Sequence, residues 1–535
     1  MTNKSIYNYA KNAQDDDKLV VASFRGFKTT RKTFFKQVDN LATYLLSMGL
    51  KKGDAVTVCL PNFPSAVVAM YAINKAGGIV NVLHPLTPPK ALRENLEGKN
   101  CKILFYFDNF CKKAQNELSN WQGKVIVCSA SDYLKGIEFF GMSVRDLFHP
   151  SRYLPSKQFI LYRKTIKNNN LKANFPEIKG EDVCLYLNSG GTTGSPKTVK
   201  ISNKALNELA PAVSSLCREK RPGDSMLMVL PFFHGFGIGV CVHHSLYAGM
   251  KIVMVPSFNP KAINSIIRRE KVTHLCGVPN MFDKMMKERN FRGKYLSNLK
   301  NAYSGGDSLS SEIKEKFDKI LEEYGGKARL VEGYGLAETI AVCVSNTLWD
   351  NQPQCLGKAV LNNKAIVLSN DDIPLPCGEV GELAISSPSM MDGYLEGEDP
   401  FVFYEGEKYV KTGDLASISE DGHIYFHGRK KRMDVISGVN IFPLEIERAV
   451  NKIEGIKESC AVVKKKNGKK YIKIYITLVE YKNQKEYYTS RIIESLKKSF
   501  TKYAIPKEVE IIHEMPRTAL NKIDFISLQA KEDEE

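Results

Sequence analysis

Residues 185–198 read LYLNSGGTTGSPKT, and this stretch carries more information than any other part of the chain. Its glycines alternate with Ser and Thr hydroxyls ahead of Pro196 and Lys197. Residues 181–188, EDVCLYLN, are rich in apolar and aromatic side chains and predict a strand that leads into the loop. Glycines at such a turn let the backbone adopt positive φ and bring bare N–H groups close to an anion, and the lysine adds a point charge. The stretch therefore predicts a strand followed by a loop that holds a polyphosphate.

Two other interpretations of this loop are weaker. It is not a Walker loop, because Pro196 stands directly before Lys197, where that motif requires Gly-Lys followed by Ser or Thr. A flexible linker has a similar Gly, Ser and Thr content, but linkers rarely follow a buried strand so directly.

Length and composition exclude several classes of protein. A chain of 535 residues is too long for one ordinary hydrophobic core and fits two or three domains. The content of 43% hydrophobic and 25% charged residues is that of a globular protein. No apolar run reaches the roughly 18 residues that a membrane-spanning helix needs, and the first residues lack the apolar core of a secretion signal. The 12 cysteines form no C-x-x-C pair, which favours reduced, mostly buried thiols in the cytoplasm.

Further motifs follow the loop in order along the chain. They are EGYGLAET (332–339), YVKTGDLA (409–416), GRKKRMDVISGVNIFPLEIE (428–447) and PRTALNKID (516–524). With the loop at 188–197 and VNVLHPLTP (80–88), they resemble the adenylate-forming (AMP-binding) superfamily, which includes acyl-CoA synthetases, luciferase-like enzymes and adenylation domains. The resemblance covers nearly the whole chain and is closest to the acyl-CoA synthetases.

The resemblance implies an α/β fold with a small mobile domain. The large N-terminal adenylation domain would span residues 1–427, with parallel-rich sheets flanked by helices and a barrel-like, β-rich subdomain at about 355–427. A hinge at 428–432 would join it to an α+β lid domain at 433–535. The residues themselves agree, because apolar runs such as ILFYFDN (103–109) and KIVMVPS (251–257) alternate with helical stretches, and this alternation predicts parallel pairing.

The resemblance also implies a reaction in two steps. A carboxylate attacks the α-phosphate of Mg·ATP to give an acyl-adenylate and pyrophosphate, and a thiol then displaces AMP to form a thioester. Because an anionic nucleophile must approach a tetra-anionic substrate, cations and oriented donors have to offset the repulsion. The implied cofactors are ATP, Mg²⁺ and coenzyme A, with the phosphopantetheine of a carrier protein as the alternative thiol.

Two residues are implied to act on the reacting groups from separate loops. Lys522 would contact both the substrate carboxylate and the α-phosphate. Thr193 is the second predicted catalytic residue, and its hydroxyl belongs to the phosphate loop. Asn521 stands where the family has glycine before this lysine. Asn tolerates left-handed backbone angles better than other non-glycine residues, so the turn is expected to form.

Glu338 is implied to be the magnesium ligand and the third catalytic residue. A hard oxygen anion is what Mg²⁺ bridging phosphates requires. The usual YGxTE pattern has threonine where this chain has Ala337, which removes a hydroxyl expected to touch the AMP phosphate. Thr339 is the neighbouring hydroxyl that could replace it.

Further nucleotide contacts follow from the resemblance. Tyr334 would stack on adenine, and Asp414 and Arg429 would bind the ribose diol, because a carboxylate accepts two hydroxyl hydrogen bonds at once. Lys431 falls at the hinge on which the lid domain would turn between the two half-reactions. Gly438 lies near the expected pantetheine tunnel. The full predicted set for nucleotide and cofactor is Ser189, Gly190, Gly191, Thr192, Thr193, Gly194, Lys197, Gly305, Gly306, Tyr334, Gly335, Asp414, Arg429, Lys431 and Gly438.

His234 in PFFHGFG lies where the family has a segment that lines the acyl pocket. We interpret it as a wall or gate and not as an acid–base group, because a histidine in an apolar stretch is more often packed than catalytic. We expect the substrate to be a fatty or aromatic acid and not an amino acid. The predicted lining residues are Phe233, His234, Val278, Tyr303 and Ser304.

Three functions remain open at this point: a ligase that forms acyl-CoA, an acyl-AMP ligase that loads a carrier protein, and a non-catalytic nucleotide or acyl binder. Retention of Glu338, Asp414, Arg429 and Lys522 argues against the third, because clustered charges in a cleft are unfavourable without a role. The net charge of +17 comes mostly from dispersed lysines and does not favour nucleic acid. Only residues 464–470, KKKNGKK, form a dense cluster, which is a solvated hairpin tip or a surface that attracts CoA or an acidic carrier protein. The oligomeric state is left open.

Overall fold

The computed structural model describes residues 2–134, 158–167, 173–188, 197–217, 219–352, 354–436, 439–466, 469–480, 484–517 and 523–531. The chain divides into two compact units, each described by itself. Unit 1 comprises residues 1–365 and 385–410, and unit 2 comprises residues 366–384 and 411–535. The predicted hinge at 428–432 falls within unit 2.

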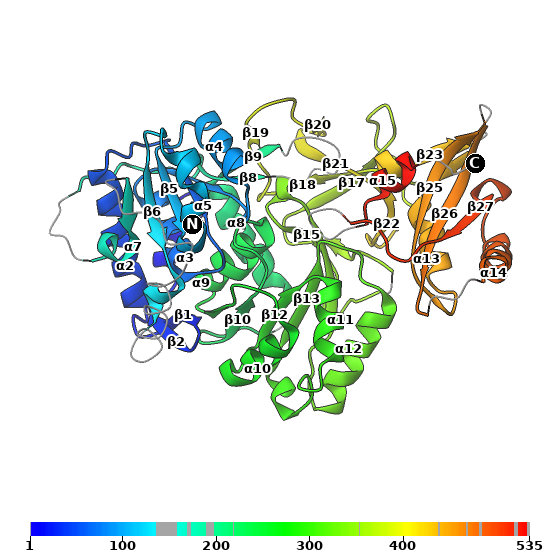
Figure 1. Cartoon of the computed structure of the whole chain (residues 1–535), viewed down its shortest axis with the longest axis horizontal. Helices are drawn as coiled ribbons and strands as arrows, with labels where there is room; N and C mark the ends of the chain where they lie inside the picture. The colour runs from blue at the N-terminus through cyan, green and yellow to red at the C-terminus, as the bar shows by residue number, and fades with distance from the viewer. Residues whose placement is uncertain are drawn as a thin grey trace. The chain divides into compact units, whose positions relative to one another are not determined.

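A nine-stranded, mostly parallel sheet forms one half of unit 1 (Figure 1). Its order is β16-β15-β14-β13-β12-β10-β11-β1-β2, and only β2, β15 and β16 run antiparallel to their neighbours. The strands are β1 (Val20–Phe24), β2 (Phe27–Thr30), β10 (Ser225–Met228), β11 (Lys251–Met254), β12 (His274–Gly277), β13 (Asn301–Gly305), β14 (Leu330–Gly335), β15 (Val342–Ser345) and β16 (Lys358–Ala359).

An eight-stranded sheet of order β19-β9-β8-β4-β3-β5-β6-β7 forms the other half. Six of its strands are parallel, and β9 and β19 close one edge in antiparallel pairing. The strands are β3 (Ala55–Cys59), β4 (Ile79–Val82), β5 (Ile103–Phe107), β6 (Lys124–Cys128), β7 (Phe159–Leu161), β8 (Val183–Asn188), β9 (Thr198–Ser202) and β19 (Gly393–Tyr394).

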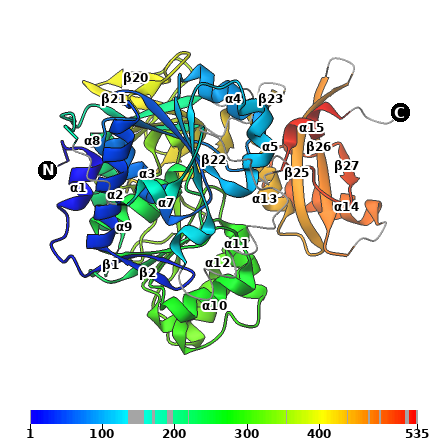
Figure 2. The same cartoon turned by 60° about the vertical axis from the view of Figure 1, so that its left-hand side comes forward.

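The helices of unit 1 bury their apolar stripes against these sheets. In α10, Ile263 and Ile267 are four residues apart and face the core, where they meet Leu275 of β12, Phe282 of α11 and Phe317 of α12. Figure 2 shows α10, α11 and α12 lying close to one another. The helices are α1 (Ile6–Lys11), α2 (Arg31–Ser47), α3 (Pro64–Lys75), α4 (Pro89–Gly98), α5 (Asp108–Leu118), α7 (Tyr162–Thr165), α8 (Asn203–Leu216), α9 (Ser245–Tyr247), α10 (Pro260–Glu270), α11 (Pro279–Lys287) and α12 (Ser311–Glu323).

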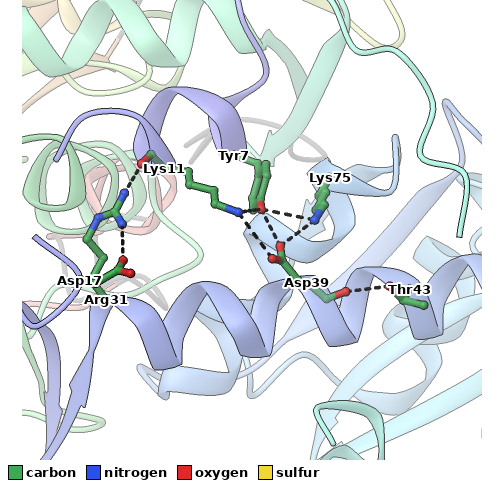
Figure 3. Close-up of polar contacts among 7 residues, drawn as sticks. All are labelled: Tyr7, Lys11, Asp17, Arg31, Asp39, Thr43 and Lys75. Atoms are coloured by element: carbon green, nitrogen blue, oxygen red, sulfur yellow. Dashed lines mark hydrogen bonds and ion pairs between the residues drawn. The ribbon is translucent and has the colours of Figure 1, made fainter. Parts of the chain in front are cut away.

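A polar network joins three of these helices near the N-terminus (Figure 3). Asp39 of α2 accepts a hydrogen bond from the Tyr7 hydroxyl of α1 at 2.5 Å and one from Lys75 Nζ of α3 at 2.7 Å. Lys11 Nζ lies 3.5 Å from the other carboxylate oxygen. The N-terminal helix is thereby held to the first helical layer.

A five-stranded sheet lies where the β-rich subdomain was expected, and its strands belong in part to each unit. Its order is β17-β18-β21-β20, with β22 paired to β21. The strands are β17 (Lys364–Leu368), β18 (Gly381–Ser386), β20 (Phe401–Tyr404), β21 (Glu407–Ile418) and β22 (Ile424–Arg429).

The C-terminal part of unit 2 is a small α+β fold. Strands β25 and β26 pair antiparallel, β27 joins β26 in parallel, and the core between them and α13 and α14 contains Ile446, Ile474 and Ile492. The elements are β23 (Asp434–Ile436), β24 (Val439–Ile441), α13 (Pro443–Val450), β25 (Ile456–Lys466), β26 (Lys469–Leu478), α14 (Lys485–Lys497), β27 (Glu508–Ile511) and α15 (Phe525–Ala530).

Two expectations about the whole chain can be compared with the structure. All 12 cysteines are free thiols, and every one except Cys377 is buried, as the sequence predicted. No helix in the described ranges combines the length and the apolarity that crossing a bilayer requires.

Candidate functional site

The predicted phosphate loop connects β8 to β9, two paired antiparallel strands of unit 1. Asn188, the last residue of β8, donates to the carbonyl oxygen of Val82 and accepts from the Thr198 hydroxyl of β9. The strand before the loop is therefore confirmed. The loop residues Ser189, Gly190, Gly191, Thr192, Thr193 and Gly194 lie outside the described residues, and so do Gly438 and Lys522.

Lys197, at the end of the loop, is described and exposed. Its Nζ lies 4.3 Å from the ring centroid of Tyr394 and 3.5 Å from the carbonyl oxygen of Glu398. The side chain is thus held over an aromatic face, directly after the predicted phosphate loop in the sequence.

The predicted adenine-binding residues come from the ends of β13 and β14, which pair in parallel. Tyr334 is half-buried on β14, and Gly305 pairs with Gly333 in the register of the two strands. A Cβ at Gly335 would lie 1.6 Å from the carbonyl oxygen of Ala341, so no other residue fits there. The sequence motif thus has a packing reason at Gly335, besides any role in nucleotide binding.

Glu338 follows β14 in the 3₁₀ turn Ala337–Thr339 and is half-buried. The Tyr394 hydroxyl donates to its Oε1 at 2.8 Å, and the Met391 backbone N–H donates to its carbonyl oxygen. Thr339 is fully buried, and its hydroxyl donates to the carbonyl oxygens of Leu336 and Ala341. That hydroxyl is engaged inside the turn, which argues against its replacing the hydroxyl that is absent at position 337.

The surroundings of Glu338 fit a magnesium ion that arrives with its nucleotide. No group of three or more His, Cys, Asp or Glu side chains is arranged to hold a metal within the described ranges. Mg²⁺ commonly takes only one or two protein carboxylates and completes its shell with phosphates and water. A single oriented carboxylate is therefore chemically suitable for Mg·ATP and unsuitable as a resident metal site.

The predicted ribose-binding pair lies in unit 2, on neighbouring strands. Asp414 of β21 and Arg429 of β22 are partners in the antiparallel register, and Arg429 Nε lies 2.9 Å from Asp414 Oδ1. The Asp414 side chain is 3% exposed, whereas that of Arg429 is 56% exposed. The two residues are 15 positions apart in the chain, and the pairing of β21 with β22 brings their side chains together.

The predicted hinge residue Lys431 is the middle residue of the 3₁₀ turn Lys430–Arg432. Its neighbours are anchored to different elements: Lys430 Nζ lies 2.7 Å from Glu382 Oε2 of β18, and Arg432 Nη2 lies 2.5 Å from Glu447 Oε1 of α13. Lys431 thus stands between two anchored side chains. Neither acidic partner was identified from the sequence: Glu382 lies in no recognised motif, and Glu447 ends the motif at 428–447, but its pairing with Arg432 appears only in the fold.

The residues predicted to line the acyl pocket occupy three elements of unit 1. Phe233 and His234 precede the π-helix Phe236–His244, and the Phe233 ring lies 4.5 Å from that of His84. Val278 is half-buried before α11, and its Cγ1 would lie 3.7 Å from a Cβ at Gly306. His234 is exposed and its Nδ1 accepts from the Phe236 backbone N–H, and its role as a wall or gate stays a prediction.

Tyr303 and Ser304 are consecutive on β13 and so point to opposite faces of the sheet. The Tyr303 hydroxyl donates to the carbonyl oxygen of Leu216 in α8. Ser304 is fully buried, and its hydroxyl has no hydrogen-bond partner among the described residues. Only one of the two can line a pocket on a given face. Phe236, missed in the sequence, reaches the same strand, because a Cβ at Gly305 would lie 3.2 Å from its Cε1.

Comparisons with known proteins decide the family. The model of the AMP-binding enzyme family matches residues 9–395, and that of the AMP-binding enzyme C-terminal domain matches residues 445–522. The chain belongs to the AMP-binding enzyme family. The predicted superfamily is confirmed, and at the level of the family so is the prediction of an enzyme of the acid–thiol ligase type.

Similar curated proteins are named as fatty-acid ligases. The long-chain-fatty-acid–CoA ligase of Bacillus subtilis (strain 168) is 28% identical over 521 residues, which cover 96% of this chain and 91% of that protein. The protein of the same name from Salmonella typhimurium is 27% identical over 519 residues, which cover 94% of this chain and 89% of its own length.

Solved structures confirm the fold class. ATP-bound MatB from Rhodopseudomonas palustris matches with a TM-score of 0.84 at 20% identity, covering 98% of each chain. A benzoate CoA ligase from Burkholderia xenovorans LB400 matches with a TM-score of 0.81 at 17% identity, covering 98% of this chain and 99% of the other. At these identities the likeness concerns the fold alone. The family accords with ATP as a cofactor, whereas the metal and the thiol acceptor belong to the proposal below.

Proposed function

We propose that this AMP-binding enzyme is an ATP-dependent ligase that converts a carboxylic acid to an acyl-adenylate and then to an acyl-CoA thioester. The observation that supports it most directly is the pairing of Asp414 with Arg429 at 2.9 Å, directly before the turn that contains Lys431. A buried carboxylate beside a partly exposed guanidinium offers both acceptors and donors to a ribose diol. A decayed relative would have no physical reason to keep a buried acid and its cation at this position.

The remaining roles follow from the chemistry of each side chain. Glu338 would hold the magnesium ion that enters with ATP, and Lys197 with the loop at 189–196 would hold phosphates. Lys522 would offset the repulsion between the substrate carboxylate and the α-phosphate. The ion supplies charge neutralisation on the phosphates, while the protein orients the nucleotide and the acid. We also propose that residues 428–432 form the hinge and the boundary between the N-terminal domain and the lid domain.

A fatty acid is the first substrate class to test, and an aromatic acid is the second. The curated relatives are named for long-chain fatty acids, and structural neighbours are named for benzoate and anthranilate. A cytoplasmic location is part of the same proposal.

The acceptor is proposed to be CoA. Lys464, the first lysine of the 464–470 cluster, is 9% exposed, and its Nζ donates to the carbonyl oxygens of Gln529 and Lys531. This lysine therefore belongs to the packing around α15 and does not present a charge to an acidic partner. The cluster is correspondingly weaker as a docking surface for a carrier protein, although that acceptor remains the alternative to test.

The test is acid-dependent exchange between ATP and pyrophosphate over a panel of fatty and aromatic acids, followed by thioester formation with CoA or a carrier protein. Lys522→Ala should lower acyl-adenylate formation by about a hundredfold or more, because one contact of this kind contributes roughly 3–4 kcal/mol to the transition state. Transfer from pre-made acyl-AMP to CoA should change much less.

Lys498→Ala is the matched control, since this exposed lysine lies at the end of α14 in the same unit. Exchange by the control should equal that of the wild type. Equal damage by Lys522→Ala to both half-reactions, or the absence of exchange with every acid, would contradict the proposal. Acyl-AMP that accumulates in millimolar CoA yet is consumed by a carrier protein would overturn the choice of acceptor.

A further inference from the structure

Tyr394 lies in no motif used above, yet its side chain connects two of the residues assigned to ATP. It belongs to β19, a two-residue strand at the edge of the eight-stranded sheet. Its hydroxyl donates to Glu338 Oε1 at 2.8 Å, and its ring carries Lys197 Nζ at 4.3 Å. The tyrosine is 56 residues from the glutamate in sequence, so only the packing of β19 brings them together.

The position of Tyr394 is fixed by its backbone. Strand β19 pairs with β9, and the Leu395 N–H donates to the carbonyl oxygen of Thr198. The Tyr394 N–H donates to Asp399 Oδ1 at 2.6 Å. Gly393 has φ of +135°, and a Cβ there would lie 2.6 Å from the Asp399 carboxylate, so the approach of this carboxylate requires glycine. The hydroxyl is therefore held by constraints that do not involve Glu338.

The hydrogen bond leaves one carboxylate oxygen of Glu338 for a ligand. No described residue forms a hydrogen bond or an ion pair with Glu338 Oε2. The phenol hydroxyl of a tyrosine is uncharged at neutral pH, so Tyr394 meets Oε1 as a neutral donor. A neutral donor orients a carboxylate without neutralising it, which preserves the charge that a metal ion needs.

We propose that Tyr394 is a positioning residue for Mg·ATP: its hydroxyl fixes the Glu338 carboxylate so that Oε2 accepts the metal, and its ring keeps the Lys197 ammonium at the phosphates. The inference rests on the proposed use of ATP but not on the acid or the thiol. It makes β19 part of the nucleotide site, although it contributes no group that touches the nucleotide.

The test separates the hydroxyl from the ring. Tyr394→Phe removes only the hydroxyl, and we expect the free Mg²⁺ concentration for half-maximal ATP binding to rise about tenfold, as is typical when a partner of a metal ligand is removed. Binding is measured by isothermal titration of ATP at a series of fixed Mg²⁺ concentrations. AMP affinity without Mg²⁺ should stay unchanged, a result that general damage to β19 would not give.

Tyr394→Leu removes the ring as well. We expect it to keep the altered Mg²⁺ requirement and in addition to weaken the binding of metal-free ATP by a few-fold, because the ammonium of Lys197 loses its aromatic support. Tyr295→Phe is the matched control, since Tyr295 is a half-buried tyrosine of unit 1 whose hydroxyl donates to the carbonyl oxygen of Asn290 at 2.6 Å. The control should bind ATP with the Mg²⁺ dependence of the wild type.

Glu338→Gln is the reference variant, because it changes the proposed metal ligand itself. If it shifts the Mg²⁺ dependence while Tyr394→Phe does not, the positioning role is overturned. If Tyr394→Phe weakens AMP and Mg·ATP by the same factor, the tyrosine is merely structural and the proposal is overturned as well. If the Tyr394 variants behave as expected but the wild type shows no acid-dependent pyrophosphate exchange, the positioning role stands and the proposed ligase function fails.

Discussion

The two units hold their candidate nucleotide-binding carboxylates in different ways. Glu338 of unit 1 is half-buried and is oriented by a neutral tyrosine hydroxyl, whereas Asp414 of unit 2 is almost fully buried and is paired with Arg429. An ion pair offsets the charge of the carboxylate and leaves it as a hydrogen-bond acceptor. A neutral donor leaves the negative charge available. The arrangement in unit 1 suits a metal-bound phosphate, and that in unit 2 suits a sugar hydroxyl.

The contrast extends to the cores. Unit 1 buries three histidines as neutral hydrogen-bonding groups: His243 with Tyr71 and Asn207, His244 with Ser214, and His274 with Thr273. In unit 2 a buried ion pair, Arg432 with Glu447, joins the hinge turn to α13. Acid and mutation should therefore affect the two units differently.

Acidification should produce the largest effect, and it should act on unit 1. Burial lowers the pKa of His243 and of His244 from 6.5 to about 3, and that of His274 to about 4. The unfolded chain binds protons below about pH 6.5 that the folded chain rejects. The free energy of unfolding should therefore fall as the pH drops from about 6.5 toward 4, by about 1.4 kcal/mol per pH unit for each histidine.

Asp132 opposes this trend, because burial raises the pKa of its carboxyl to about 7 and the folded state then gains a proton first. One carboxyl offsets only one of the three histidines. Tryptophan fluorescence during urea unfolding at pH 7.5 and pH 5 checks the prediction, since Trp121 and Trp349 both belong to unit 1. His244→Gln should flatten the pH dependence. A urea midpoint that does not move between these pH values would contradict it.

Arg432→Ala should destabilise unit 2 by about 3 kcal/mol. The side chains of Arg432 and Glu447 are 18% and 9% exposed, so the substitution leaves a buried carboxylate without its cation. Hydrogen exchange of residues 443–478 during urea unfolding measures the loss. Lys411→Ala is the control, because its pair with Asp372 is more exposed and should contribute under about 1 kcal/mol. Equal effects of the two substitutions would remove the distinction between these pairs.

Asp414→Asn should weaken AMP binding about tenfold, whereas Glu338→Gln should leave it unchanged. Asp414→Asn weakens charge-assisted hydrogen bonds to the ribose, each of which contributes roughly 1.5–3 kcal/mol. AMP binds without requiring the metal, so Glu338→Gln should leave its affinity unchanged while impairing Mg·ATP binding. Calorimetric titration with AMP and with Mg·ATP gives both numbers. If both substitutions weaken AMP alike, Glu338 has no role specific to the metal.

Lys465→Glu should have the smallest effect, changing turnover with CoA by less than about twofold. Lys465 is exposed on β25, whereas Lys464 donates to carbonyl oxygens near α15. Lys464→Glu should instead destabilise unit 2, because it puts a carboxylate against carbonyl oxygens that now accept from the lysine. Steady-state rates with CoA and thermal unfolding of each variant distinguish the two. A strongly salt-dependent loss with Lys465→Glu would indicate docking of an acidic partner.

Much of the fold could be predicted because it depends on local patterns. The apolar runs at 103–109 and 251–257 form the parallel strands β5 and β11, since strands buried on both faces are apolar throughout. The ordered motifs predicted the family, and the family comparison confirms it. The roles of the individual site residues remain predictions, including those of Lys522, Thr193 and Gly438, which lie outside the described residues.

The sequence by itself determined the family, the strand that leads to the phosphate loop and the identity of the charged residues. Only the tertiary structure decided which groups hold those charges: Tyr394 for Glu338, Glu382 for Lys430 and Glu447 for Arg432. It also decided that Lys464 is buried in a cluster that the sequence presents as uniformly solvated. The reason is physical, since hydropathy patterns report which face of an element is buried, whereas an individual contact depends on strand register and on packing between distant segments.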